Sequence, residues 1–376
     1  MIIAINLLPQ PDEIEISVFG PGYGESIVIH VGKGNWFVVD CCMDKSTQTP
    51  KPILYLESLG VNPAEKVKFI AATHWHDDHV AGLSKMLEIC SSAVFCCPVS
   101  LTSKEFLALS ELYKDAPVGQ KPGTEELRRS IEIATKRSHV EKKHMLKFSH
   151  ADKKIHQIDD LKVSVFGLSP SDEMIRRCND FMLSSYAAAT SQTTVLQRLI
   201  VKSPNDTAAV LRLNIKNRAI LLGSDIEEHG DPLVGWSSIV ASHDSESGIY
   251  HSYKVAHHGS KSGHHDDVWS KLLTKNPLSM ITPFRLGRHK LPNSADRARI
   301  MSLTDQAYIT ANPDRETPPK GKRASKVEAL IASAAQHRRS VIDTVGHIRW
   351  RAMIDDEKDP GLIELFDGAL PLSKVA

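Results

Sequence analysis

Three histidines and two aspartates lie within six residues near the end of the first quarter of the chain. The run reads His74-Trp75-His76-Asp77-Asp78-His79 and directly follows the apolar run 67–72. Neutral imidazoles and ionised carboxylates are the usual ligands of zinc and its transition-metal neighbours. In an extended turn, His74 and His76 point the same way and can hold one ion, which leaves Asp78 and His79 for a second ion beside it. A solvated loop or a helix N-cap is the alternative, but capping needs one carboxylate and does not explain three histidines.

The residues around this cluster predict the elements that position it. The run 67–72 is typical of a buried strand, and the apolar residues Val80, Leu83, Met86 and Leu87 have helical spacing. The cluster therefore lies on a turn from a strand into a helix. In an α/β sheet, functional groups gather at the carboxyl ends of the strands, because the loops there form the crevice.

Other polar residues also stand at the ends of apolar runs. Asp40 directly follows the apolar run 36–39. Asp225 follows the apolar run 219–222, with Gly223 and Ser224 between. The histidine pair His257-His258 follows the run 253–256. Asp225 is the natural bridge of two metal ions, because a carboxylate can give one oxygen to each. An acid such as Asp40 beside a buried strand is costly unless it is paired. A plain turn aspartate is the alternative for Asp40.

These motifs, in this order, resemble those of the metallo-β-lactamase superfamily. Gly223 before the acid, the histidine pair before Gly259-Ser260 and the glycine-rich turn 20–26 are most similar to its ComEC-type branch. The resemblance spans about residues 14–292. It implies an α/β fold, an αββα sandwich of two mixed sheets flanked by helices, around a dinuclear metal centre. The metal ligands that it implies are His74, His76, Asp78, His79, Asp225 and His258.

The resemblance also implies roles for residues around the ligands. Asp40 would accept a hydrogen bond from a ligand histidine and so fix its tautomer. Asn205 stands where the superfamily commonly places a lone histidine ligand, which leaves the first metal site with fewer protein ligands. His289, close to Pro292, approximately matches a ComEC-type histidine near the site; a solvated basic loop is an equal alternative.

The histidine pair leaves one question open. Adjacent side chains on an extended segment point opposite ways, so His257 and His258 cannot share one role. One binds metal, and the other faces the substrate as a hydrogen-bond donor or proton carrier. The resemblance favours His258 as the ligand, but the sequence does not rank the two. Ser260 and Lys261 then supply a hydroxyl and a cation beside the centre, as a phosphate or an oxyanion requires.

Length and charge limit the organisation and the partners. The chain has 376 residues, 46 Lys and Arg, and 45 Asp and Glu, so no global charge recruits nucleic acid. Residues 120–156 carry a local net charge of +5, from ten basic and five acidic residues, which indicates either a phosphate-chain contact surface or a solvated helix face. We expect a hydrolase domain over 1–310 with a helical insertion at about 101–156, and an extension over 311–376 that packs on the same domain. In that extension, the sequence predicts a helix over residues 326–335 and a hairpin formed by residues 346–354 and 362–365.

The sequence has no basic, cleavable leader, no apolar run of eighteen residues and no Cys-x-x-Cys pair among its six cysteines. These features predict reduced thiols and a soluble, cytoplasmic protein that does not bind a membrane.

We therefore expect a metal-dependent hydrolase that carries zinc (two Zn2+ ions), with manganese (Mn2+) as the alternative. Bound metal would generate hydroxide at neutral pH, and Asp78 would orient it. The resemblance and the basic, hydroxyl-rich surroundings favour nuclease or phosphodiesterase activity on DNA or RNA. A small ester, thioester, lactam or cyclic nucleotide is the rival substrate, and a catalytically idle metal-binding interaction module is the rival class. The resemblance also implies a regulated effector in bacterial defence with a regulatory protein partner; the oligomeric state stays open.

Overall fold

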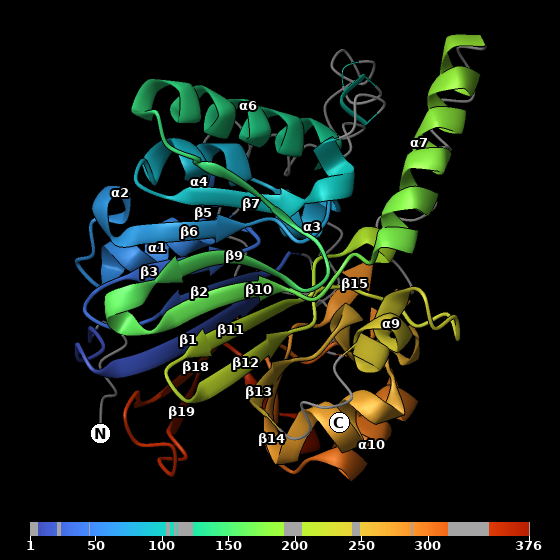
Figure 1. Cartoon of the computed structure of the whole chain (residues 1–376). Coiled ribbons are helices and arrows are strands. Elements are labelled where there is room, and N and C mark those ends of the chain that lie inside the picture. The colour runs from blue at the N-terminus through green and yellow to red at the C-terminus, as the bar shows by residue number, and fades with distance from the viewer. Residues whose placement is uncertain are drawn as a thin grey trace, which may run out of the picture.

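Two eight-stranded sheets packed face to face form the centre of the computed structural model (Figure 1). Helices cover the outer face of each sheet, so the predicted αββα sandwich is confirmed. The structure describes residues 7–20, 24–44, 46–102, 106–108, 111, 123–191, 205–242, 249–286, 289–314 and 346–375.

The strand orders show how distant parts of the chain build each sheet. The first sheet runs in the order β19 (Leu362–Phe366), β18 (Gly346–Met353), β1 (Glu13–Gly20), β2 (Ser26–His30), β3 (Trp36–Val39), β6 (Val67–Ala71), β7 (Val94–Pro98) and β8 (Leu146–Ser149). The second runs in the order β20 (Leu370–Pro371), β17 (Ala307–Ile309), β14 (Leu273–Ile281), β13 (Tyr250–Lys254), β12 (Arg218–Leu222), β11 (Leu211–Ile215), β10 (Val163–Gly167) and β9 (Lys153–Ile158). Two small hairpins pair β4 (Met43–Asp44) with β5 (Thr49–Pro50), and β15 (Phe284–Leu286) with β16 (His289–Leu291).

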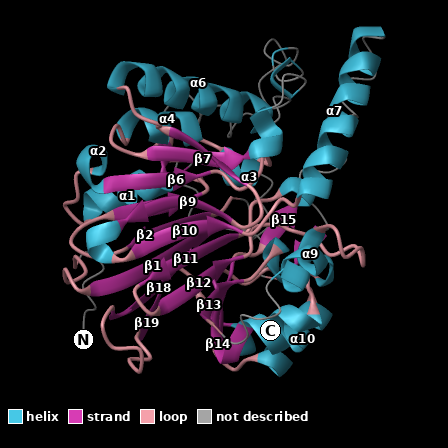
Figure 2. Ribbon diagram, viewed as in Figure 1, coloured by secondary structure: helices cyan, strands magenta, loops and turns pink. Residues whose placement is uncertain are grey.

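The helices divide between the two outer faces (Figure 2). The first sheet packs against α1 (Lys51–Ser58), α4 (Leu83–Ile89) and α6 (Gly123–Glu141), and the second against α9 (Gly235–Ser242) and α10 (Ser294–Leu303). Two short helices, α2 (Pro63–Lys66) and α3 (Asp77–Val80), flank β6 in the chain. The long helix α7 (Asp172–Ser191) projects away from the body of the molecule (Figure 1).

Strand β3 is apolar at every position because both of its faces are buried. Its side chains alternate in direction, as in any strand. Phe37 and Val39 join the core between the sheets, whereas Trp36 and Val38 join the core beneath the helices. Both faces of the strand are therefore buried, and each fully buried side chain of this size stabilises the fold by about 1.5–3 kcal/mol.

Parallel pairing brings the polar strand ends to one edge of the sandwich. In the first sheet β3 pairs parallel to β6, and in the second sheet β12, β13 and β14 are parallel neighbours. The segments that leave these strands carry Asp40, the cluster His74–His79, Asp225, the pair His257-His258 and Thr282. The carboxyl ends of parallel strands lie on the same side of a sheet, so these groups meet.

The end of the predicted helical insertion needs a correction. The helical part is confirmed by α6, but residues 146–158 form β8 and β9 at the outer edges of the two sheets. In β9 the sequence Lys-Lys-Ile-His-Gln-Ile buries Ile155 and exposes Lys153 and Lys154. Lysines are typical of edge strands, where they oppose pairing with another chain, and here their charge obscured the strand pattern.

The C-terminal residues contribute to both sheets. The predicted hairpin 346–354 with 362–365 is confirmed, since β18 and β19 pair antiparallel, and β18 also pairs with β1. Strand β20 pairs with β17 in the second sheet. The predicted helix 326–335 lies outside the described residues. Within the described part of the chain, no helix combines the length and apolar composition needed to cross a bilayer.

We expect the free energy of unfolding to decrease as the pH falls from 6.5 toward 4, in part because of His30. This buried ring donates from Nδ1 to the carbonyl of Glu13 at 2.8 Å and accepts at Nε2 from the Gly34 amide at 2.9 Å, so it must be neutral. Burial lowers the pKa of His30 from 6.5 to about 4. Between these values the unfolded chain binds a proton that the folded chain does not, so stability present above pH 6.5 is lost, by up to roughly 3 kcal/mol.

Urea unfolding at pH 7.5, 6 and 5 measures this loss, with the His30→Gln variant as the comparison. The variant should show a shallower dependence of stability on pH than the parent chain. Equal slopes for the two proteins would rule out His30 as a contributor.

Candidate metal centre

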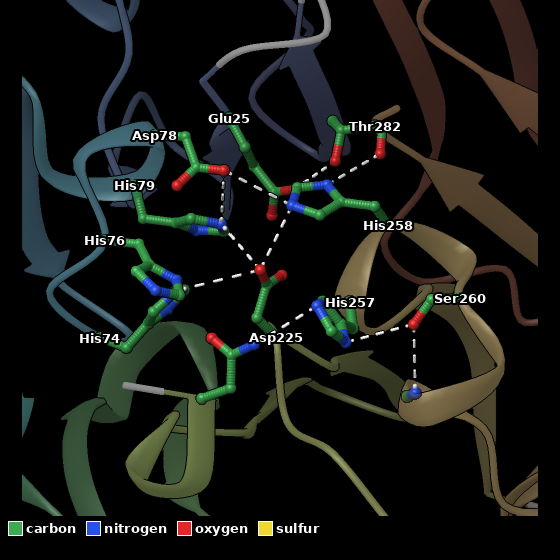
Figure 3. Close-up of polar contacts among 12 residues, drawn as sticks. Glu25, His74, His76, Asp78, His79, Asp225, His257, His258, Ser260 and Thr282 are labelled. Carbon is green, nitrogen blue, oxygen red and sulfur yellow. Dashed lines mark hydrogen bonds and ion pairs between the residues drawn. The ribbon is translucent and has the colours of Figure 1, made fainter. Parts of the chain in front are cut away.

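Side chains from both sheets converge on one point at the edge of the sandwich (Figure 3). Three groups of potential ligands are found there, each with its donor atoms within 4.8 Å of one another; the group Glu25, Asp40 and His79 shares its histidine with another group, and the other two have no residue in common. The first group is His74, His76 and Asp225, and the second is Asp78, His79 and His258. All but His76 are buried, and His76 is half-buried. All six metal ligands that the sequence predicts are therefore brought together.

Asp225 lies between the two groups. Its Oδ2 is 3.9 Å from His74 Nε2, 3.4 Å from His79 Nε2 and 3.2 Å from His258 Nε2. Asp78 approaches the second group from the other side, with Oδ2 3.8 Å from His79 Nε2 and 3.5 Å from His258 Nε2. This central place is the one that a carboxylate bridging two ions occupies.

The unpaired polar atoms of this cluster fit a bound cation. His79 Nε2, His258 Nε2 and Asp225 Oδ1 are buried and have no hydrogen-bond partner among the described residues. Leaving a buried polar atom without a partner costs about 1–3 kcal/mol. Imidazole nitrogens and carboxylate oxygens are the donors that zinc takes in proteins.

The electrostatics of the cluster also favour positive charge at this point. Burial lowers the pKa of His258, but Asp225 and Asp78 outweigh it and raise the pKa to about 10. Burial likewise opposes protonation of His79, yet Asp225, Asp78 and Asp40 raise its pKa well above the ordinary value. Burial raises the pKa of Asp225, but His258 and His79 hold it well below its usual range.

Asp40 holds the ring of His79 in place. Its Oδ2 accepts from His79 Nδ1 at 2.8 Å, while the amide and the hydroxyl of Thr73 donate to Asp40, each at 2.7 Å. The bond at Nδ1 leaves Nε2 of His79 facing the cluster. This is the position predicted for Asp40, and such partners orient and tune a ligand histidine.

His258 is oriented from the second sheet. Its Nδ1 lies 3.0 Å from the carbonyl oxygen of Thr282, so Nδ1 carries the proton and Nε2 faces Asp225 and Asp78. Glu25 Oε2 lies 4.0 Å from the same Nδ1. Glu25 accepts from the Thr282 hydroxyl and pairs with Lys254 at 2.7 Å, and both charged groups are completely buried.

The histidine pair lies on a tight turn and not on the extended segment that we expected. His257 and His258 have φ values of 44° and 54°, in the left-handed region, and so do Asp40 (59°) and Ser224 (50°). Each such residue other than glycine costs on the order of 1–3 kcal/mol and persists where the surroundings impose it. Four of them in one site indicate that the surrounding structure imposes this backbone conformation at the site.

His257 faces away from the ligand groups into a hydroxyl network. Its Nδ1 is 2.9 Å from Ser262 Oγ and 3.1 Å from Ser260 Oγ, and its Nε2 is 3.3 Å from the amide nitrogen of Asn205. Asn205 also donates to Glu227 at 2.8 Å. Asn205 and Ser260 therefore contact His257 and not a ligand of either group.

Two predicted residues are not drawn into the cluster by any contact within the described part of the chain. Lys261 is exposed on the turn after Ser260. His289 is exposed on β16, where it pairs with Leu286 at the tip of the β15–β16 hairpin. The hairpin reaches the centre through Phe284, whose ring lies 5.3 Å from that of His258. The catalytic roles of Lys261 and His289 stay predictions.

The sequence interpretation missed Glu25, Lys254, Thr73 and Thr282. Lys254 carried a usable signal, because a lysine inside a strand expected to be buried needs an opposite charge nearby. Its partner Glu25 lies more than two hundred positions away in the chain, so no local pattern could identify it.

We expect the two histidines of the pair to differ in metal content when each is replaced. His258→Ala removes a donor of the second ligand group and should lower the bound metal from about two ions per chain to about one. His257→Ala leaves both groups intact and should keep the metal of the parent chain. Inductively coupled plasma mass spectrometry measures the ratio, and equal losses in the two variants would contradict this assignment.

Comparison with known families agrees with this geometry. Residues 19–151 match the model of the metallo-beta-lactamase superfamily. The matched range contains Asp40 and the cluster His74–His79, and it supports the superfamily that the motifs resemble. The fold is the metallo-β-lactamase sandwich. The match to this superfamily supports the conclusion that the chain is a hydrolase that binds metal ions. No curated protein sequence matches the chain.

Several solved structures of the metallo-β-lactamase fold resemble the chain at low identity. The fold protein YhfI from Bacillus subtilis is 12% identical, with a TM-score of 0.37 over 79% of this chain and 95% of that one. The metallo-β-lactamase SMB-1 bound to 2-mercaptoethanesulfonate is 12% identical, with a TM-score of 0.35 over 68% and 82%. A metallo-β-lactamase-like protein (tm0894) from Thermotoga maritima is 14% identical, with a TM-score of 0.28 over 56% and 69%. At these scores the likenesses carry no argument about the activity.

Proposed function

We propose that this protein is a metal-dependent phosphodiesterase that cleaves DNA or RNA. The observation that carries the proposal is the position of Asp225 between two groups of ligands, because a two-metal centre can stabilise both the attacking and the leaving oxygen of a displacement. Zinc suits the imidazole-rich donor set, with manganese as the alternative. Bound metal supplies a hydroxide at neutral pH and polarises the phosphate.

The side chains at the centre have different roles in the proposed reaction. His74, His76, Asp78, His79, Asp225 and His258 hold the ions, and the carboxylate of Asp78 lies where it can also orient a nucleophile. His257 is partly exposed beside the cluster and is the candidate proton donor for the leaving oxygen. Ser260 and Ser262 hold its ring through Nδ1. Nε2 of His257 lies 3.3 Å from the amide nitrogen of Asn205, so it would transfer a proton only after a bound substrate displaces that amide.

A phosphodiester is preferred over a lactam or an ester for two reasons. The rim of the centre carries hydroxyls and the exposed Lys261, and basic residues are frequent in the stretch 120–156. Hydroxyl and cationic groups of this kind bind the non-bridging oxygens of a phosphate. The glycine before Asp225 and the histidine pair before Gly259-Ser260 also resemble the ComEC-type branch. A regulatory protein partner that holds the activity in check is part of this proposal.

Labelled single-stranded DNA, double-stranded DNA and RNA, each with added zinc or manganese, provide the test. We expect cleavage of at least one polymer and a loss on the order of 10³-fold in the Asp78→Ala and His79→Ala variants, because each removes a donor from the ligand groups. Binding of the polymer should weaken as salt rises, since phosphate contacts release counterions.

Two outcomes would reject the proposal. Equal cleavage by the parent chain and both variants would mean that a contaminant acts. No cleavage of any polymer at two bound ions per chain would reject a constitutive nuclease and direct the search to small esters.

A further inference from the structure

A cavity of about 530 Å³ lies beside the metal centre, between α7 and the segments 205–207 and 229–234. Its size is within the range of roughly 300–1,000 Å³ that is usual for small-molecule sites. The residues that matter most for its chemistry are Trp75, Met174, Phe181, Asp206 and His229.

The cavity and the metal centre are formed in part by the same segments of the chain. Trp75 lines the cavity and stands between His74 and His76 of the first ligand group. Asp206 lines it too and follows Asn205, whose amide nitrogen lies 3.3 Å from Nε2 of His257. A backbone hydrogen bond of 2.8 Å from Ala209 to Thr73 ties these two segments together. The lining of the cavity is therefore only one residue along the chain from two candidate ligands and from Asn205.

The inner surface of the cavity is apolar and partly aromatic. Trp75, Met174 and Val234 are buried, and Phe181 is partly exposed. Flat apolar groups pack well on aromatic rings and on the polarisable sulfur of methionine. This part of the cavity suits an aromatic ring.

The rim is polar, but its charges are matched. Asp206 pairs with His229 at 2.9 Å, and Arg177 pairs with Asp231 at 2.7 Å. The cavity therefore offers no excess positive charge that would hold a phosphate. In addition, Oδ1 of Asn205, at the border with the centre, is buried and has no hydrogen-bond partner among the described residues. An uncharged group with hydrogen-bonding edges fits these conditions.

We propose that this cavity binds the nucleobase of the nucleotide next to the scissile phosphate. The inference rests on the proposed phosphodiesterase function and names the part of the substrate that is recognised. The faces of the base pack on Met174 and Phe181, and its polar edge meets Asp206 and His229.

Isothermal titration calorimetry with adenosine, guanosine, cytidine and uridine tests the cavity without any phosphate. The parent chain, loaded with metal, should bind at least one nucleoside saturably. Phe181→Ala removes an aromatic wall and should weaken that binding about tenfold or more. Cys178→Phe adds bulk to a residue that lines the cavity and should abolish it. Leu183→Ala, on the exposed side of the same helix, is the matched control and should bind as the parent does.

Metal content, measured for every variant, should stay at the parent value. No saturable binding of any of the four nucleosides, or equal binding by Phe181→Ala, Cys178→Phe and the parent chain, would overturn the inference.

Cleavage of a dinucleotide and of its abasic counterparts links the cavity to the reaction. Phe181→Ala should raise KM about tenfold for the substrate that carries a base and leave the abasic one unchanged. Cleavage without nucleoside binding would contradict the proposal that the cavity binds a base, but it would agree with the proposed phosphodiesterase activity. Nucleoside binding without any cleavage would instead overturn the proposed function.

Discussion

Asp225→Asn should strongly reduce metal-dependent hydrolysis while the chain still folds. The carboxylate of Asp225 lies between the two ligand groups, within 3.9 Å of one imidazole of the first and within 3.4 Å of two imidazoles of the second. An asparagine has the same shape, but it offers a single neutral oxygen and cannot bridge two cations. We expect kcat to fall on the order of 10³-fold and the bound metal to fall below one ion per chain.

The loss of metal should also appear in the stability of the protein. A ligand that binds only the folded chain stabilises it by about 2.7 kcal/mol when its concentration is a hundred times its dissociation constant. Added zinc should therefore raise the unfolding temperature of the parent chain and have little effect on Asp225→Asn. A chelator should remove the difference between the two.

Asp77→Asn is the matched control for this experiment. Asp77 lies in the same cluster and loses the same charge, but it is exposed and belongs to neither ligand group. It should keep the metal and the activity of the parent chain. A bridging role for Asp225 would be contradicted if Asp225→Asn kept two ions, or if both variants lost metal equally.

Lys254→Met should destabilise the fold by about 3–5 kcal/mol, because it leaves a carboxylate buried without its partner. Lys254 and Glu25 are both fully buried, 2.7 Å apart, at the junction of the two sheets. Glu25 also accepts from the hydroxyl of Thr282. Replacing one partner removes the attraction but keeps the desolvation cost of the other.

The pH dependence of this variant has a definite sign. Burial raises the pKa of Glu25, but Lys254, His79 and His258 together outweigh burial and hold the pKa below its usual value in the parent chain. Lys254 is the largest of these three contributions, so we expect its removal to let burial raise the folded-state pKa above the unfolded value. Stability of the variant is then recovered as the pH falls, so the penalty should shrink between pH 7.5 and pH 5.

A double-mutant cycle with urea unfolding measures the interaction energy between Glu25 and Lys254. The Glu25→Gln/Lys254→Met double variant should recover most of the loss, because neither residue then carries a charge. Lys153→Met, an exposed lysine of strand β9, is the matched control and should change stability by less than about 0.5 kcal/mol. A loss below about 1 kcal/mol in Lys254→Met, or a double variant less stable than both single ones, would contradict the ion pair.

The candidate ligands could be predicted because their signal is local. Asp40, the cluster His74–His79, Asp225 and the pair His257-His258 each follow a short apolar run. A polar residue that directly follows a buried strand of an α/β sheet lies at its functional edge. The residue types then point to metal chemistry without knowledge of the strand order.

Other features had no local signal. The edge strands β8 and β9 read as part of a helical insertion, because their lysines and short length hide the alternation. The extended geometry expected for His257 and His258 was wrong, since neighbouring segments hold both residues in the left-handed region. A backbone conformation that surroundings impose is not visible in the propensities of the residues themselves.

The chain's sequence was thus sufficient for a set of candidate ligands, since residue type and hydrophobic period act over a few neighbouring positions, and the resemblance of its motifs to the metallo-β-lactamase superfamily implied the sandwich fold. Only the tertiary structure decided which histidine of the pair faces Asp225, that Glu25 meets Lys254, and that α7 closes a cavity beside the centre. These are contacts between residues far apart in the chain. They depend on strand order and on the packing of the two sheets, and side chains that share no local pattern meet only after that packing is complete.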